Sequence, residues 1–194
     1  MASVCVFCSS SLDIDPAYLS LAAAVGARLG TGGHRLVSGG GRVSMMGALA
    51  TAARKHGAHT LGVIPEQLVR LEVADTDADE LLVVQTMRER KALMDAHAEA
   101  FLVLPGGIGT LEEFFEAWTA GTLGMHAKPV VVLDPDGFYQ PLWQFVLSMV
   151  ERGFVRQRAW QQLHLVDSVE AAFAVIEARS PVEVQSSKPA STAE

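Results

Sequence analysis

Short apolar runs alternate with longer segments of helical periodicity along most of the chain. The runs that we expect to form strands cover residues 3–8, 35–38, 59–64, 81–84, 101–104 and 129–133. The segments that we expect to form helices cover residues 16–29, 44–56, 86–97, 138–151 and 169–178, with one more from Thr110 to about residue 123. Proline at the start and glycine at the end of the first helix support its limits.

Strands that alternate with helices are typical of parallel sheets. We therefore expect an α/β fold, a Rossmann-like open parallel sheet flanked by helices on both faces. Residues 72–80 are acidic and irregular, which predicts an exposed excursion. Because no repeat or linker interrupts the pattern, residues 1–179 are predicted to form a single domain. Residues 180–194 are rich in Ser, Pro, Ala and Glu and lack aromatics, which predicts a disordered C-terminal tail.

Charge and hydropathy narrow the function classes. The 194 residues include 15 Lys plus Arg and 22 Asp plus Glu, a formal net charge of −7. An acidic chain argues against a nucleic-acid partner. No apolar run approaches the ~20 residues that cross a bilayer, so we expect no membrane partner. Asp13 and Asp15 follow the first apolar run where a signal peptide would need a longer one, which predicts a cytoplasmic location.

The cysteines and histidines indicate neither redox chemistry nor a metal. Cys5 and Cys8 form a C-x-x-C pattern inside an apolar strand, where they point to opposite faces. A redox motif of this kind belongs at a helix N-terminus, so we expect two buried structural thiols. The six His are scattered singly, and we predict no metal and no cofactor.

Two glycine-rich loops are the first candidates for a binding site. Residues 39–41 are three consecutive glycines, and residues 105–110 read Pro-Gly-Gly-Ile-Gly-Thr; each loop follows a strand and opens a helix. Backbone N–H groups and the helix dipole converge on an anion in such loops, usually a phosphate. Neither loop has the Lys-Ser or Lys-Thr of a P-loop, and neither completes G-x-G-x-x-G. Tight turning alone is the alternative explanation, although three glycines exceed what a turn requires.

A carboxylate follows the second loop. Thr110 and Glu113 have the spacing of a capping box, which would make Glu113 a structural cap. A carboxylate near a helix start is also held anionic beside whatever the loop binds, where it would act as a base or charge stabiliser. Glu112 points about 100° away around the helix, so we expect only one of the two glutamates to face the crevice.

A second stretch places cations on an apolar helix face. Met87, Arg90, Lys91, Met94 and Ala98 form one helical stripe. A cation on an inward face is costly unless it meets a carboxylate or a phosphate, so an anionic ligand is the interpretation that we favour. The alternative is that the aliphatic stems cover apolar surface while the charged ends reach water.

These motifs resemble a known family. Residues 105–113, Pro-Gly-Gly-Ile-Gly-Thr-Leu-Glu-Glu, are similar to the PGGxGTxxE motif of the Lonely Guy (LOG) proteins, cytokinin riboside 5′-monophosphate phosphoribohydrolases that have often been labelled lysine decarboxylases. The resemblance extends to residues 38–41, 45–47, 62–65, 87–91 and 126–129, in order. It implies hydrolysis of the N-glycosidic bond of N6-modified AMP, and of AMP, to the free base and ribose 5-phosphate. Nothing in the sequence indicates pyridoxal phosphate.

The resemblance also implies roles for individual residues. Arg90 and Glu113 would be catalytic. The residues that would bind substrate are Glu72, Arg90, Lys91, Gly107, Ile108, Gly109, Thr110, Leu111, Glu112, Glu113 and Thr119. Accessory loop positions would be Ser10, Gly40, Gly41 and Met87. Family members are typically homodimers with shared active sites; the aromatic segment 114–118 would serve such an interface or, equally, the core.

The chain departs from the family pattern at four positions. Ser9 and Ser44 stand where the family has glycine, Ser38 where it often has tyrosine, and Arg88 where it commonly has histidine. The two loop serines concern loop shape, and Arg88 adds a charge that bears on substrate preference. Two other functions stay open at this point: a non-catalytic nucleotide-binding or carrier protein of the same fold, and a broader nucleotide 5′-monophosphate nucleosidase.

Overall fold

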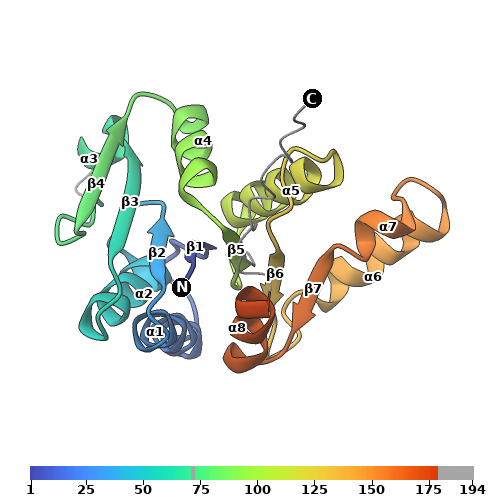
Figure 1. The fold of residues 1–194 in the computed structure, drawn as a ribbon, viewed down its shortest axis with the longest axis horizontal. Coiled ribbons are helices and arrows are strands. Elements are labelled where there is room, and N and C mark those ends of the chain that lie inside the picture. Colours follow the sequence, from blue (N-terminus) through green and yellow to red (C-terminus); the bar gives the residue numbers. More distant parts are fainter. Residues whose placement is uncertain (71–72, 179–194) are drawn as a thin grey trace, which may run out of the picture.

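The computed structural model describes residues 1–70 and 73–178. In this part of the chain seven strands form one sheet in the order β4-β3-β2-β1-β5-β6-β7, and every neighbouring pair is parallel (Figure 1). The strands are β1 (Ser3–Phe7), β2 (Arg35–Ser38), β3 (Thr60–Pro65), β4 (Glu80–Val84), β5 (Ala100–Val103), β6 (Val130–Leu133) and β7 (Leu163–Val166). Val4 of β1 lies opposite Leu36 on one side and Ala100 on the other. The predicted parallel α/β sheet is confirmed.

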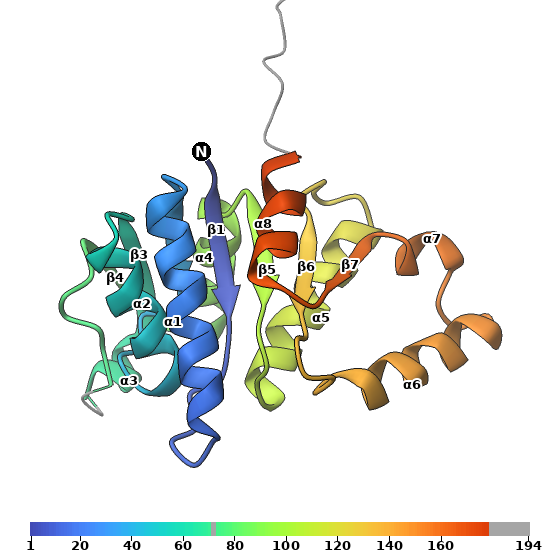
Figure 2. The ribbon, with the colours of Figure 1, turned by 90° about the horizontal axis from the view of Figure 1, so that it is seen from below.

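Helices cover both faces of this sheet, as predicted (Figure 2). They are α1 (Pro16–Thr31), α2 (Ser44–Lys55), α3 (Glu66–Arg70), α4 (Met87–His97), α5 (Ile108–Thr122), α6 (Gln140–Glu151), α7 (Gln157–Trp160) and α8 (Val169–Ala178). Apolar side chains of α1, α2 and α8 form the core on one face. Those of α4, α5 and α6 form the core on the other. No helix in the described ranges has the length and apolar character needed to span a membrane.

The burial of individual side chains decides two expectations, one about the cysteines and one about the aromatic segment 114–118. Cys5 and Cys8 are free, buried thiols that belong to the cores on opposite faces of the sheet, as predicted. The aromatic segment of α5 serves the core: Phe114 and Trp118 are buried, and Phe114 contacts Trp143 of α6 edge-on.

Three short elements escaped the sequence pattern. Helices α3 and α7 span five and four residues, too few for a hydrophobic period to repeat. Strand β7 is an edge strand whose residues are mostly half-exposed, so it lacks the continuous apolar run of a central strand.

The predicted capping box at Thr110 is wrong. Helix α5 begins at Ile108, with Gly107 as its N-cap and no side-chain cap, so Thr110 lies inside the first turn. The Thr110 side chain instead packs against Gly106, where no larger residue would fit: a Cβ there would stand 2.2 Å from the Thr110 hydroxyl oxygen. A capping box does occur at the start of α4, between Thr86 and Glu89.

The acidic stretch before β4 is not the wholly exposed excursion that its composition predicted. Ala74 and Asp75 are buried, and Ala74 forms an antiparallel bridge with Gly41. Asp75 can be buried because it forms an ion pair with Arg54 of α2, which compensates its charge inside the protein. Glu72 and the predicted tail, residues 180–194, lie outside the described residues.

Candidate active site

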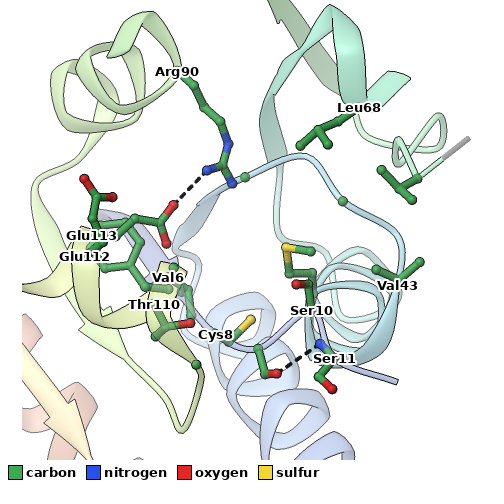
Figure 3. A pocket seen from close by; sticks show the side chains of 18 of the residues that line it. Val6, Cys8, Ser10, Ser11, Val43, Leu68, Arg90, Thr110, Glu112 and Glu113 are labelled. Carbon is green, nitrogen blue, oxygen red and sulfur yellow. Dashed lines mark hydrogen bonds and ion pairs between the residues drawn. The ribbon is translucent and has the colours of Figure 1, made fainter. Parts of the chain in front are cut away.

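A cavity of about 610 Å³ lies where the carboxyl ends of β1, β2, β3 and β5 meet (Figure 3). The chain passes outward from β1 through β2 and β3 to β4, then returns through α4 to place β5 on the other side of β1. Ligands of open parallel sheets bind at such a switch in strand order, because the loops on its two sides diverge and leave a crevice. We call this cavity the cleft.

One side of the cleft is built to meet an anion. Gly107, Ile108, Gly109 and Thr110 line it from the start of α5. Ser9, Ser10 and Ser11 line the cleft from the loop after β1, which extends to the start of α2, where the Ser44 hydroxyl donates to the Ser11 carbonyl. The first N–H groups of a helix have no partner within the helix and carry its positive dipole end. A side chain at Gly107 or Gly109 would project into open space, so these glycines leave the backbone accessible to a ligand.

The opposite side of the cleft is apolar. Val43 and Met46 come from the start of α2, Leu68 from α3, Val73 from the segment before β4, and Met87 from α4. The cleft therefore pairs an anion-binding end with a surface suited to a flat or branched apolar group.

Arg90 and Glu113 form a buried ion pair that faces the cleft. An Arg90 guanidinium nitrogen donates to Glu113 Oε1 at 2.8 Å, and both side chains are 11% exposed (Figure 3). Arg90 belongs to α4 and Glu113 belongs to α5, so the ion pair joins the two helices across the switch in strand order. Charges this buried are strongly destabilising when their partner is removed.

Arg90 is also held from behind. Its Nε donates to the carbonyl oxygen of Val63 in β3 at 3.1 Å. Its guanidinium lies over Gly39, where a Cβ would stand 1.7 Å from a guanidinium nitrogen. The first glycine of the triple-glycine loop is therefore required by the close approach of Arg90.

The environment of Glu113 changes its acidity. Burial raises the pKa of Glu113 above that of an ordinary glutamate, and the charge and hydrogen bond of Arg90 oppose this effect without cancelling it. Burial also raises the pKa of Cys8, another residue lining the cleft, to about 12, with Glu113 adding to the rise. Cys8 is thus a neutral thiol, whereas Glu113 is the carboxylate that can exchange a proton at the cleft.

Lys91 and Glu112 lie beside the catalytic candidates rather than among them. Lys91 bridges Glu112 and Glu116, one turn apart on α5. Partial burial disfavours the Lys91 charge, but these two carboxylates outweigh it and raise the pKa of Lys91. Glu112 is 53% exposed at the cleft rim, whereas Glu113 is 11% exposed and pairs with Arg90. Both glutamates line the cleft, so the expectation that only one of them faces it is wrong.

The structure brings most of the predicted site residues together. Those that line the cleft are Ser10, Gly41, Met87, Arg90, Gly107, Ile108, Gly109, Thr110, Glu112 and Glu113. Gly40 and Leu111 do not line the cleft, although their neighbours in the sequence do. Gly40 has a φ of +69°, and Leu111 packs against the core. Lys91 and Arg88 line a neighbouring cavity of about 460 Å³ between α4 and α5. Thr119 lines a third cavity, beside Phe154.

Sequence reasoning missed the backbone that supports the site. Gly39 and the Val63 carbonyl hold Arg90, and Ser9 and Ser11 complete the loop after β1. The run of three glycines was a signal for Gly39, but its partner was not readable because two strands, β3 and β4, separate Gly39 from Arg90 along the chain. In the described ranges no three His, Cys, Asp or Glu side chains gather as metal ligands would.

Comparisons with known proteins find relatives that align with most of the chain. A family described as possible lysine decarboxylase matches residues 46–176. The chain is 48% identical over 170 residues to a cytokinin riboside 5′-monophosphate phosphoribohydrolase of Mycobacterium marinum, covering 88% of this chain and 90% of the relative. A protein of the same name from Mycobacterium tuberculosis is 49% identical over the same shares. Among solved structures, the molybdenum cofactor binding protein of Rippkaea orientalis superimposes with a TM-score of 0.71 at 21% identity, covering 91% of this chain and 96% of that one, which shows a shared fold.

Proposed function

Because the chain belongs to the LOG family of cytokinin riboside 5′-monophosphate phosphoribohydrolases, we propose that it hydrolyses the N-glycosidic bond of N6-modified AMP, and of AMP, to the free base and ribose 5-phosphate. The observation that carries the proposal is the buried Arg90–Glu113 pair, which faces the cleft beside an anion-binding helix start. The anion-binding end suits the 5′-phosphate, and the apolar side suits the base with its N6 substituent.

In the proposed mechanism the bond between C1′ and the base nitrogen breaks while water attacks C1′. The sugar carries positive charge in a transition state of this kind, as in other glycosidic hydrolyses. Glu113, as a carboxylate, stabilises that charge and accepts a proton from the attacking water; the departing base takes up a proton in turn. Arg90 keeps Glu113 anionic and oriented. The backbone of residues 107–110 holds the phosphate.

The direct test is base release followed by chromatography. Isopentenyladenosine monophosphate, AMP and isopentenyladenosine are each incubated with the protein, and Glu113→Gln serves as the control. We expect release from both monophosphates, fastest from the isopentenyl one, and none from the riboside. Glu113→Gln should abolish release while nucleotide binding persists, because it keeps the size of the side chain and removes the charge.

Other outcomes would replace this proposal. A folded protein that releases no base from any monophosphate would favour a nucleotide-binding or carrier protein, with Arg90 and Glu113 as a structural ion pair. Equal release from purine and pyrimidine monophosphates would favour a broader nucleosidase. Undiminished turnover by Glu113→Gln would refute the mechanism while leaving the activity in place.

We further propose a homodimer in which the partner subunit completes each active site. The resemblance implies that Thr119 binds substrate, but Thr119 lines a cavity apart from the cleft of its own subunit. A homodimer in which Thr119 reaches the partner's cleft would reconcile the two. Phe145 of α6 and Phe154 after it are 61% and 81% exposed, which suits a surface covered by a second copy. Light scattering should give twice the chain mass, and Phe154→Asp should lower it; a monomeric wild type would contradict the proposal.

A further inference from the structure

Arg54 and Asp75 form a second buried ion pair, on the apolar side of the cleft. Two guanidinium nitrogens of Arg54 contact the two carboxylate oxygens of Asp75 at 2.7 and 3.2 Å. The side chains are 20% and 8% exposed, and among the ion pairs of the described residues only Arg90–Glu113 is comparably buried. Arg54 belongs to α2, and Asp75 belongs to the segment that leads into β4.

The segment that Asp75 anchors lies against the triple-glycine loop. The Asp75 N–H donates to the Gly40 carbonyl at 2.8 Å, and the Arg42 N–H donates to the Val73 carbonyl at 2.8 Å. Ala74, between them, bridges Gly41. Residues 73–75 therefore pair with residues 40–42 like a short added strand, and Val73 contributes to the cleft.

The same loop is packed tightly on its other side. A Cβ on Gly41 would stand 2.5 Å from the end of Met46 in α2, the helix that carries Arg54. Helix α2, the glycine loop and residues 73–75 thus contact one another in turn, and the Arg54–Asp75 pair connects the first of these to the last. The loop is held between two elements whose separation the ion pair fixes.

Stability alone is a weak explanation for such a pair. A buried ion pair is often no more stabilising than apolar residues of the same volume, because both charges lose their hydration. A two-pronged contact between a guanidinium and a carboxylate does fix distance and orientation. Geometric control of the loop and of residues 73–75 is the benefit that this arrangement offers.

We infer that Arg54 and Asp75 are positioning residues that hold the apolar side of the cleft in its nucleotide-binding shape. The inference rests on the proposed function. The pair acts on nucleotide affinity rather than on bond cleavage, because Arg90 has its own anchors in Glu113 and the Val63 carbonyl. Neither residue touches the nucleotide in this proposal.

The test compares Asp75→Asn, Arg54→Gln and the double variant with the wild type. Each protein is measured for kcat and KM with AMP and for melting temperature. The Kd of AMP is measured by calorimetry with the same changes made in the Glu113→Gln protein, which should bind AMP without hydrolysing it. We expect each single change to raise KM and Kd by about tenfold, since small misplacements of a binding surface weaken binding at this level. We expect kcat to stay within about twofold, because the chemical groups keep their contacts. The double variant should be no worse than the worse single one, since both remove the same contact.

A matched control separates positioning from general stability. Glu177→Gln removes the negative charge that contacts Arg28 at 2.6 Å and His34 at 3.1 Å, a contact that joins α8 to α1 near the opposite end of the sheet. It should lower the melting temperature and leave KM unchanged. Arg54→Lys, which keeps the charge but not the two-pronged contact, should raise KM less than Arg54→Gln does.

Several results would overturn the inference. One is an unchanged KM and Kd in folded Asp75→Asn and Arg54→Gln. Another is a fall in apparent kcat at constant KM, which is what loss of folded protein alone produces. A wild type that binds AMP but releases no base would refute the proposed function, while the Kd values of the variants would still decide the role of the pair.

Discussion

Glu113 sets a specific pH dependence for the proposed reaction. Because burial raises its pKa, the carboxylate becomes protonated at a higher pH than an ordinary glutamate does, whose pKa is about 4.3. If the anion is the active form, kcat/KM should fall as the pH is lowered through this raised pKa. In Arg90→Gln the fall should begin at a still higher pH, because Arg90 opposes the rise. Residual kcat/KM measured across pH checks both statements; an acid limb at the ordinary glutamate value would contradict them.

Gly39 should be intolerant of even one added methyl group. Its φ is not in the left-handed region, so Gly39→Ala can keep the backbone, but the new Cβ would overlap the Arg90 guanidinium. We expect kcat to fall by about 100-fold, since a displaced Arg90 no longer orients Glu113.

A glycine of similar geometry provides the control for that prediction. In Gly32→Ala the Cβ would stand 2.2 Å from a guanidinium nitrogen of Arg28 and 2.6 Å from the ring of the buried His34, neither of which lines the cleft. Turnover should therefore be retained in Gly32→Ala. Equal losses of kcat in the two variants would show that the effect at Gly39 is not specific to Arg90.

The backbone at Ser44 has a conformation that favours glycine, the residue of the family pattern at this position. Ser44 has a φ of +52°, and in the described ranges it is the one non-glycine residue with positive φ. Its hydroxyl donates to the Ser11 carbonyl, tying the loop after β1 to the start of α2. Ser44→Ala keeps the strain and loses the bond, and should lower the free energy of unfolding by about 1 kcal/mol. Ser44→Gly also removes a strain of about 1 kcal/mol, so its stability should stay near wild type in chemical denaturation.

The starts of α4 and α5 show where sequence reasoning at the level of elements succeeds and fails. Both helices follow polar or glycine-rich residues, and both were predicted. The capping motif was assigned to α5, although the two glycines before Thr110 allow the backbone to enter the helix earlier, at Ile108. Glu113 consequently lies in the second turn, where burial rather than the helix dipole dominates its acidity.

The capping box at the start of α4, the helix that carries Arg90, should contribute measurably to the stability of the protein. Thr86 Oγ1 accepts from the Glu89 N–H at 3.1 Å, and a Glu89 carboxylate oxygen accepts from the Thr86 N–H at 3.0 Å. Thr86→Ala should lower the free energy of unfolding by about 1 kcal/mol, whereas Thr86→Ser keeps the acceptor and should stay close to wild type. Urea unfolding of the two variants checks this; equal values would show that the cap is dispensable.

At the scale of the molecule, the order of the longer helices and the apolar strands was predictable, and the pairing between distant residues was not. Apolar runs and glycine loops locate most of the strands and the anion-binding end, because these depend on local pattern. The contacts that shape the rest of the cleft link Arg90 to Gly39 and Asp75 to Arg54, charged or flexible side chains whose partners are decided by packing. For this reason the acidic composition of residues 72–80 wrongly predicted that Asp75, which is buried, would be exposed.

The return of the chain through α4 divides the protein into two pieces that each hold half of the catalytic pair. A cut between His97 and Ala100 would leave Arg90 with β1 to β4 and Glu113 with β5 to β7. Neither fragment alone should release base from AMP, because the cleft forms only when β5 pairs with β1. Co-expressed fragments should regain activity in proportion to their reassociation, so the enzyme would work as a split reporter whose signal is free adenine.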